Sequence, residues 1–368
     1  ENLNSMNESL NESERKRNQL EENLNSMNES LNESEMKRNQ LENDVREMKK
    51  QFELFAEKFN QVADQPLSNF ASSKEIIIMG GFDGKQFKQS VCIFNPANGT
   101  YAELPPMNSP RMGASSCVYN NDVIVAGGWD GKRCLHSIEF LRVNQDLSRW
   151  TILNSRLPAK LRGHVLKVYQ EKLLVIGGWD CDTKKTFNEI NELALDKPYT
   201  PTLLATMPEP RVFHVAEIID DKLFILGGKK SHYGDDTVVH DSVVVYDFIT
   251  KEFQTFPSLP EPVYFMSTVT WEKKIIVIGG VDKTGGVSND VIMYDIESGH
   301  WEPLPQLRRK RSGLSTVMIN DVIFVFGGWN VEQGFLNSVE GFKMGSDGWK
   351  ELPGMTENRN FPTAVVTP

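Results

Sequence analysis

The chain contains neither glycine nor proline before Pro66. Since these two residues are the strongest helix breakers, their absence permits one uninterrupted helix. The whole chain lacks an apolar run of 18 or more residues, so no transmembrane helix is expected. Its formal net charge of −10 argues against nucleic acid or an anionic membrane as a partner.

Cysteine is also scarce. The four cysteines, Cys92, Cys117, Cys134 and Cys181, form no Cys-x-x-Cys motif and no cluster with histidine. This usage predicts neither a disulfide framework nor a metal site. It is typical of a reducing compartment, so we expect a cytoplasmic protein.

Two of the six histidines, His232 and His240, share one loop with Asp235 and Asp236. A metal site and a solvated, charged loop are the two interpretations; we favour the loop and predict no metal. The chain contains no P-loop, no Gly-x-Ser-x-Gly motif and no His-Glu-x-x-His motif. We therefore predict no catalytic residues and no cofactor, and we expect that the chain is not an enzyme.

Residues 1–21 and 22–42 are nearly identical, and a duplication of this length equals three heptads. The apolar 3–4 spacing continues through nine heptads and predicts one long α-helical coiled coil over residues 1–63. The a positions are Leu3, Leu10, Arg17, Leu24, Leu31, Arg38, Val45, Phe52 and Phe59. The d positions are Met6, Ser13, Leu20, Met27, Ser34, Leu41, Met48, Phe55 and Val62.

The polar layers at Ser13/Arg17 and Ser34/Arg38 interrupt this stripe. Such layers set register or partner at the expense of stability. Self-association through residues 1–63 and a solvated single helix are the alternatives. We favour self-association, with two strands ahead of three. Residues 64–73, which include Pro66, are expected to be a linker.

A second pattern begins at residue 74. Six short apolar runs each end in a glycine pair, and the first glycines are Gly80, Gly127, Gly177, Gly227, Gly279 and Gly327. Their spacings along the chain, 47, 50, 50, 52 and 48, define a repeat architecture. Each repeat shows four strand-like runs separated by turn residues and almost no helical periodicity.

Four-stranded units that repeat around an axis predict an all-β, six-bladed β-propeller over residues 74–368. The first glycine-pair strand has no arginine-led strand before it, whereas segment 359–367 is an arginine-led strand with no glycine pair after it. We therefore expect the C-terminal strand 359–367 to complete the first blade.

The repeats resemble the kelch family. The resemblance rests on the glycine pairs, on a downstream aromatic such as Tyr246 or Tyr294, and on a later tryptophan such as Trp301 or Trp349. It implies a kelch β-propeller like that of BTB-kelch adaptors. Some kelch-like propellers are copper radical oxidases, but nothing here marks their Cys–Tyr pair and two histidine ligands, so a metal-dependent enzyme is the least favoured alternative.

An arginine precedes the first glycine at a nearly constant distance along the chain in five of the six repeats. These residues are Arg111, Arg162, Arg211, Arg311 and, across the closure, Arg359, while the remaining repeat has Val263-Tyr264. In register, the side chains would form a ring near one mouth of the central channel and bind carboxylate or phosphate ligands. Internal pairing with acids of the propeller is the alternative interpretation.

The residue after each glycine pair is aromatic in four repeats: Phe82, Trp129, Trp179 and Trp329. Exposed tryptophan and arginine together are typical of binding hot spots, whereas packing on the blade core is the structural alternative. In BTB-kelch adaptors, matching arginines and aromatics contact an acidic peptide, and the resemblance implies that role for these residues and for Tyr264. Lys229 and Val281 depart from the aromatic pattern.

The sequence thus predicts an oligomeric interaction module that recruits a protein partner through an acidic peptide segment. The resemblance to BTB-kelch adaptors implies recruitment for a ubiquitin ligase. The alternative is a cytoskeletal protein that binds actin. Neither nucleic acid nor a membrane is expected as a partner.

Overall fold

The computed structural model describes residues 2–63, 74–143, 146–195, 197, 199–232 and 238–368. The chain divides into two compact units, Glu1–Asp64 and Gln65–Pro368. Each unit is described by itself.

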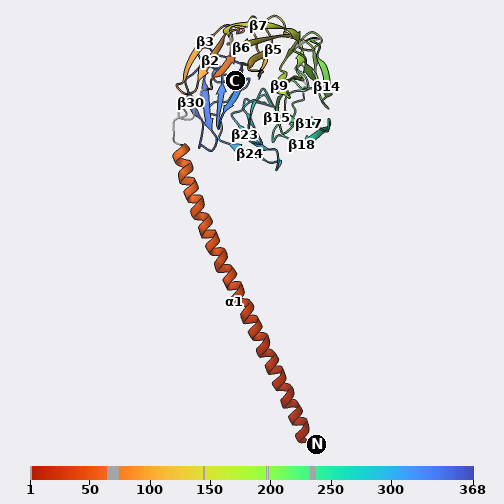
Figure 1. The fold of residues 1–368 in the computed structure, drawn as a ribbon, viewed down its shortest axis with the longest axis vertical. Helices are drawn as coiled ribbons and strands as arrows, with labels where there is room; N and C mark the ends of the chain where they lie inside the picture. The colour runs from red at the N-terminus through yellow and green to blue at the C-terminus, as the bar shows by residue number, and fades with distance from the viewer. Residues whose placement is uncertain (1, 64–73, 144–145, 196, 198, 233–237) are drawn as a thin grey trace. The chain divides into compact units, whose positions relative to one another are not determined.

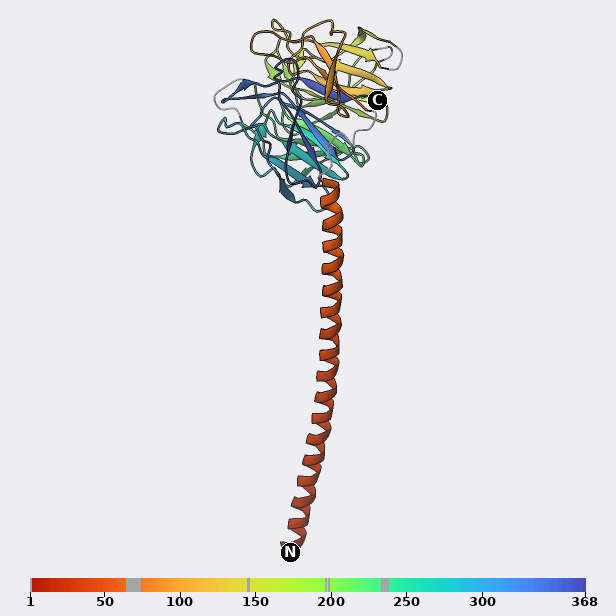
Figure 2. The same ribbon diagram turned by 90° about the vertical axis from the view of Figure 1, so that its left-hand side faces the viewer.

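The first unit is the helix α1 (Asn2–Ala63), which runs without interruption (Figure 2). Its 62 residues span about 93 Å at 1.5 Å per residue. Where side chains are described, the apolar a and d positions are exposed, from 41% at Val45 to 70% at Met27. Among the described residues, no helix is both long and apolar enough to span a bilayer.

In the second unit, the described residues form six four-stranded antiparallel sheets. The chain passes from one sheet to the next once around a ring, which the colour sequence of Figure 1 follows from orange to blue. The innermost strands touch one another in a closed cycle. This is a six-bladed β-propeller, as the repeat pattern predicted.

The strands of each blade are given from the axis outward. Blade 1 holds β31 (Thr363–Val366), β1 (Ile76–Met79), β2 (Val91–Asn95) and β3 (Thr100–Leu104). Blade 2 holds β4 (Ser115–Tyr119), β5 (Asp122–Ala126), β6 (Ser137–Arg142) and β7 (Asp146–Arg156). Blade 3 holds β9 (Val165–Tyr169), β10 (Lys172–Ile176), β13 (Glu189–Leu193) and β14 (Thr202–Thr206).

Blade 4 holds β15 (Val215–Ile219), β16 (Lys222–Leu226), β17 (Val243–Asp247) and β18 (Phe253–Phe256). Blade 5 holds β20 (Ser267–Trp271), β21 (Lys274–Ile278), β23 (Val291–Asp295) and β24 (Trp301–Leu304). Blade 6 holds β25 (Ser315–Ile319), β26 (Val322–Phe326), β29 (Val339–Lys343) and β30 (Lys350–Leu352). Short ladders flank the blades: β8 (Leu161–Arg162), β11 (Trp179–Asp180), β12 (Lys185–Thr186), β19 (Val263–Tyr264), β22 (Val281–Asp282), β27 (Trp329–Asn330) and β28 (Gly334–Phe335).

The hydrophobic core lies between the blades. The second strand of each blade is apolar on both faces because both faces are covered by neighbouring sheets, and Ile76, Ile77, Ile78 and Met79 are all fully buried. Each of six apolar clusters joins residues of two neighbouring blades. Removal of one blade therefore exposes two apolar interfaces.

The glycine pairs allow this close approach. Gly177 and Gly178 have φ angles of 56° and 107°, in the left-handed region that glycine tolerates best. A Cβ atom on Gly177 would lie 2.6 Å from the Arg211 carbonyl oxygen, and one on Gly178 would lie 2.7 Å from the His164 Cβ. The second glycine of each pair donates its N–H to the next blade, as Gly178 does to the Arg211 carbonyl at 2.8 Å.

A cyclic chain of backbone hydrogen bonds closes around the axis, just before the innermost strands. Its six members each donate to the carbonyl of the preceding member over 2.7–3.3 Å: Gly113, Gly163, Phe213, Phe265, Gly313 and Phe361. All six have φ between 53° and 65°, which is unusual for the three phenylalanines. We call this cycle the axial ring.

The two ends of the propeller meet in blade 1. β31 pairs with β1, from Thr363 opposite Met79 to Val366 opposite Ile76. The C-terminal strand lies innermost in a sheet whose other three strands come from the start of the propeller. Ring closure therefore joins segments far apart in the sequence, since Glu75 donates its N–H to Thr367 at a separation of 292 residues.

The cysteine prediction needs correction. Cys134 and Cys181 form a disulfide with a Cα–Cα distance of 5.9 Å. They follow the glycine pairs of blades 2 and 3 and are separated by 47 residues, about one repeat. The sequence did not predict this disulfide because the two cysteines are far apart along the chain. They become neighbours only when the propeller places the loops of consecutive repeats side by side.

Two histidines lie directly beneath the axial ring. His164 follows Gly163 and His214 follows Phe213, and both are buried. Burial, together with the nearby charges of Arg111 and Arg211, lowers the pKa of each imidazole to about 3. Both histidines are therefore neutral in the folded propeller at neutral and mildly acidic pH.

We predict that the propeller loses stability as the pH falls below 6.5. The unfolded imidazoles take up protons near pH 6.5, whereas the folded ones do so only near pH 3, so acid favours the unfolded state. Between pH 7 and pH 5 each histidine should cost about 2 kcal/mol of unfolding free energy. Urea unfolding across this range measures the slope. Replacing His164 and His214 with glutamine should flatten this slope. An unfolding free energy that is constant from pH 7 to pH 5 would contradict the prediction.

Candidate functional site

A short segment precedes the innermost strand of each blade, and two adjacent positions in it have side chains that face opposite sides. One position of this segment, which we call the inner position, holds Arg111, Leu161, Arg211, Val263, Arg311 and, across the closure, Arg359. The next residue, at the outer position, pairs with the one after the glycine pair, as Arg162 pairs with Trp179 and Tyr264 with Val281. Because alternate residues of an extended chain point to opposite sides, a shift by one position changes the side that a side chain faces.

Arg111 and Arg311 are buried in equivalent pockets. The Nη1 atom of Arg111 donates to the carbonyls of Gly127 and Ser137 at 2.6 and 3.1 Å, and its Nη2 donates to Glu139 at 2.8 Å. Arg311 repeats these contacts with Gly327, Ser338 and Glu340, and its ion pair with Glu340 measures 2.7 Å. Burial lowers the pKa of both guanidinium groups, and the paired glutamates oppose this shift.

Arg211 occupies the same place without a carboxylate. It donates to the carbonyls of Gly227 and Ser242 at 2.9 and 3.1 Å and to the Ser242 hydroxyl at 2.6 Å. Val244 stands where blades 2 and 6 have glutamate. Burial lowers the pKa of Arg211 to about 10, against the opposing charges of Glu209 and Asp241, so the guanidinium remains charged at neutral pH.

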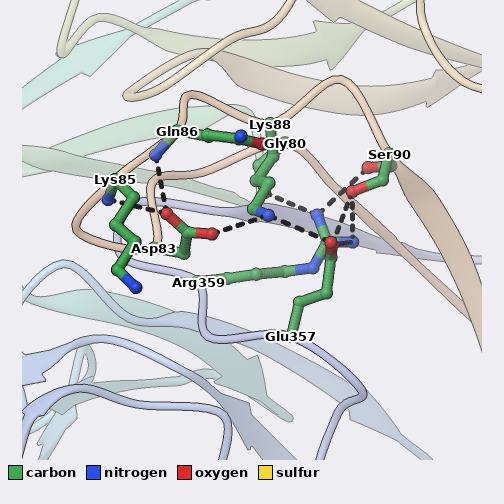
Figure 3. A network of polar contacts seen from close by, with 8 residues as sticks. All are labelled: Gly80, Asp83, Lys85, Gln86, Lys88, Ser90, Glu357 and Arg359. Atoms are coloured by element: carbon green, nitrogen blue, oxygen red, sulfur yellow. Dashed lines mark hydrogen bonds and ion pairs between the residues drawn. The ribbon is translucent and has the colours of Figure 1, made fainter.

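Arg359 fastens the closure of the ring (Figure 3). It donates to the Gly80 and Ser90 carbonyls at 2.7 and 3.0 Å, and its ion pair with Glu357 measures 3.1 Å. Lys88 joins the same network through Glu357 at 3.0 Å and Asp83 at 2.7 Å. The hydrogen bond from Lys88 is the main reason that the pKa of Asp83 falls to about 2.

These contacts correct the prediction that the arginines form a partner-binding ring. Arg111, Arg211, Arg311 and Arg359 are each at most 2% exposed, and the hydrogen-bond partners given above all belong to the propeller. The alternative interpretation, internal pairing with an acid, holds for Arg111, Arg311 and Arg359. Arg211 is held inside the propeller by carbonyls and a hydroxyl instead. All four fix the segment before each innermost strand to its own blade, and they are out of reach of a partner protein.

Arg162 differs because it stands at the outer position, with buried Leu161 at the inner one. Its guanidinium lies over the Trp129 ring at 5.4 Å and contacts His232. Farther around the mouth, the Lys229 ammonium lies 4.7 Å from the centre of the Tyr264 ring. We call Trp129, Arg162, His232, Lys229 and Tyr264 the cationic arc; all five side chains are partly exposed.

The three phenylalanines of the axial ring meet beside the arc. The ring centroids of Phe213 and Phe265 are 4.4 Å apart, and those of Phe265 and Phe361 are 4.6 Å apart. Phe213 also lies 5.1 Å from the His232 ring, and Phe265 lies 4.7 Å from Tyr264. These contacts connect the two ends of the arc through a continuous aromatic surface contributed by blades 2 to 5 and blade 1.

The aromatics that follow the glycine pairs do not act as a set. Trp179 is only 3% exposed, so its expected contact with a partner is corrected to a packing role. Phe82 is partly buried against Phe87 and Phe335, at centroid distances of 4.5 and 5.4 Å. Trp329 is half-buried and bridges to Ser312 through its backbone. Two of the four touch the arc: Trp129 belongs to it, and buried Trp179 packs against His232 with ring centroids 5.6 Å apart.

The arc carries positive charge. Burial lowers the pKa of His232 to about 4, and the charges of Arg162 and Lys229 contribute, so His232 is neutral at pH 7. Burial also lowers the pKa of Lys229. Two cations set among aromatic rings favour an anionic ligand with some apolar surface, such as an acidic peptide.

The candidate metal loop is only partly described. Asp235 and Asp236 lie outside the described residues, and His240 is buried beside Glu209 at 3.2 Å. In the part of the chain that the structure describes, no group of three or more histidine, cysteine, aspartate or glutamate side chains is placed to hold a metal ion.

Some of the arc had a sequence signal and some did not. The offset of Arg162 by one position was visible in its spacing, and it distinguishes this arginine from the buried four. Lys229 follows a glycine pair and could have been found in the same way. The sequence contained no signal for His232, Phe213 and Phe265, because their contacts depend on how blades 3 to 5 meet at the axis.

The family model described as the KLHDC2/KLHL20/DRC7 Kelch-repeats domain matches residues 66–228 and 163–366. No curated protein matches the sequence significantly. Among solved structures, the one titled "Structure of YjhT" is similar, with a TM-score of 0.60 and 16% identity over 70% of this chain and 88% of that one. At this identity the likeness shows a shared fold.

The match to YjhT corrects one expectation, namely that the chain is not an enzyme. That expectation rested on missing motifs. A propeller fold shared with so distant a protein is compatible with more than one kind of activity, because function resides in sites and the fold alone does not decide it. The exclusion of enzymatic activity is therefore withdrawn.

We predict that Arg311→Ala destabilises the propeller by about 3–5 kcal/mol, because it leaves Glu340 buried without its cation. Arg211→Ala is the matched control, since it removes the same side chain where no carboxylate is paired, and it should cost about 1–3 kcal/mol. Urea unfolding of both variants measures the difference. Equal losses would show that the buried ion pair is not the source of the Arg311 effect.

Proposed function

Because this chain belongs to the kelch-repeat family, as its glycine pairs predicted, we propose that its propeller binds a protein partner at the cationic arc. Kelch repeat domains bind protein partners, and this supports the general class of function. The proposal for this chain is narrower: the arc receives an acidic segment of the partner.

The observation that carries the proposal is the composition of the arc. Arg162 and Lys229 each contact an aromatic ring, at 5.4 and 4.7 Å, in a chain whose net charge is −10. The two cations attract an acidic segment at short range, and the charge of the chain as a whole restricts this attraction to the arc. Arginine and aromatic side chains in contact are also the residues that dominate binding energies at protein interfaces.

The finer role we propose is that of an adaptor, with the propeller recruiting a partner or substrate protein for a ubiquitin ligase. The description of the matching family model supports a kelch-repeat interaction domain, and the ligase connection rests on the resemblance to BTB-kelch adaptors. Actin binding remains the alternative. Co-sedimentation with filamentous actin that persists after substitution of Arg162 and Lys229 would favour it.

We also propose that α1 self-associates as a coiled coil. Its heptad positions Leu20, Leu24, Leu31 and Leu41 are between 58% and 68% exposed on the isolated helix, which leaves a long apolar stripe uncovered. Association would bring two or more propellers together and raise the avidity for a multivalent partner. The cytoplasmic location expected from the cysteines is retained as a proposal, and the Cys134–Cys181 disulfide counts against it.

Binding at the arc can be tested by affinity capture with the full chain as bait. Truncation of Arg162 and Lys229 to alanine should lose the partners that the unchanged protein captures and weaken binding of an acidic peptide from them by about tenfold or more. Arg133→Ala is the matched control, because Arg133 is 73% exposed and outside the arc. If the double variant recovers the same partners at the same affinity, the arc is not the binding site.

Self-association can be measured by sedimentation equilibrium. The full chain should show a concentration-dependent mass of at least two protomers, and residues 74–368 alone should be monomeric. Replacing Leu24 and Leu31 with asparagine should shift the equilibrium toward monomer, because it adds polar groups to two a layers. A full chain that remains monomeric at tens of micromolar would exclude the coiled coil.

A further inference from the structure

The inner position of blade 5 holds a valine. Val263 lies as far before Gly279 in the sequence as Arg211 lies before Gly227. Its backbone is placed like that of the arginines, because its carbonyl accepts the Gly228 N–H at 2.9 Å just as the Arg211 carbonyl accepts the Gly178 N–H at 2.8 Å. Blade 5 thus keeps the backbone of the site with a much shorter side chain.

A cavity of about 380 Å³ opens at this place. Its lining includes Val263, Gly279, Asp290 and Ile292. Gly279 corresponds to Gly227 and Asp290 to Ser242, because the Gly279 N–H donates to the Asp290 carbonyl as the Gly227 N–H donates to that of Ser242. The two residues whose carbonyls receive the Arg211 guanidinium in blade 4 therefore have counterparts in the wall of the blade 5 cavity.

Blade 4 shows that this frame holds a guanidinium group without a buried carboxylate. Val244 and Ile292 are equivalent, since each pairs with the residue two before its glycine pair. In blade 4 the guanidinium is held by two carbonyls and by the Ser242 hydroxyl at 2.6 Å. Blade 5 has Asp290 at the residue equivalent to Ser242. Its carboxylate accepts from the Ser288 hydroxyl at 2.6 Å and from the Gln306 amide at 2.8 Å, and it is a stronger acceptor for a cation than a hydroxyl because a carboxylate oxygen can accept more than one hydrogen bond.

The charges around the cavity favour the same ligand. Glu261, Asp282 and Asp290 line it with one basic residue, Lys283. Hydrogen bonds from Thr284 and the backbone lower the pKa of Asp282, so its carboxylate is ionised at neutral pH. Val263, Val277 and Ile292 supply apolar wall, suited to the methylene stem of a long cationic side chain.

We propose that this cavity, the blade 5 pocket, binds a guanidinium group carried on an alkyl stem. The stem packs on Val263 and Ile292, and the guanidinium donates to Asp290 and to the Gly279 carbonyl. The volume falls within the range of about 300–1,000 Å³ that is usual for small-ligand sites. The group can come from a free small guanidine or from an arginine side chain of a partner protein. The site uses no residue of the cationic arc, so its test is independent of the test of the proposed function.

The test is calorimetric titration of the full chain with two probes. Agmatine represents the free ligand, and a short arginine-containing peptide represents a partner; a peptide with citrulline in place of arginine is the neutral control. Saturable binding of either probe, at least tenfold tighter than the citrulline peptide, is expected. Tighter binding of agmatine than of the arginine peptide would assign the site to a small molecule, and the reverse order would assign it to a protein partner.

Val263→Arg fills the pocket with the chain's own guanidinium and should reduce probe binding more than tenfold while raising the thermal midpoint. Val331→Arg is the matched control, since it adds the same side chain at a residue that is 78% exposed. Asp290→Asn, at an exposed position, should weaken binding about tenfold and covers the case in which Val263→Arg does not fold. The proposal is overturned if the folded protein binds neither probe, if citrulline binds as well as arginine, or if Asp290→Asn binds like the unchanged chain.

Discussion

The structure depends on the axial ring, the six-membered cycle of backbone hydrogen bonds around the propeller axis. Each member must bring its backbone within 2.7–3.3 Å of a neighbouring blade. All six positions have a left-handed φ, which glycine tolerates best, and at Gly163 an added Cβ atom would also lie 2.5 Å from the Phe213 ring. The glycine pairs, the buried arginines and the closing strand β31 all hold the same segment in place.

The same constraint gives adjacent residues different roles, because one holds the blade together and the next can contact a partner. In that extended segment, the residue at the inner position is directed into the blade and the next one faces the opposite side. Arg162 and Tyr264 are partly exposed on that side, whereas Val212 is buried there. Four blades place arginine at the inner position, blade 3 moves it outward to Arg162, and blade 5 has Val263 instead. A ring of equivalent repeats thereby acquires two unequal sites, a cationic arc at the mouth and a small acidic pocket in blade 5.

Much of the fold could be predicted from the sequence, because the glycine pairs and turn residues recur in every repeat and encode local structure. Two-residue turns such as Asn120-Asn121 and Asp220-Asp221 have positive φ at both positions, as tight hairpins require. The site was harder to predict. The nearly constant spacing of the five arginines looks like one motif in the sequence. Side chains at the inner and outer positions nevertheless point to opposite sides of the segment, so Arg162 faces away from the side on which the other four are buried. The burial of Trp179 and the Cys134–Cys181 bond depend on contacts between consecutive repeats, which no local pattern encodes.

The central claim is that one arginine of the five faces the mouth while four lock the blades. Arginine-specific labelling of the native chain with phenylglyoxal, read by peptide mass spectrometry, tests it in one experiment. We expect Arg162 to be modified more slowly than the surface residue Arg133 but well before Arg111, Arg211, Arg311 and Arg359, which should react only after unfolding. Modification of those four at the rate of Arg162 in the folded protein would contradict the account.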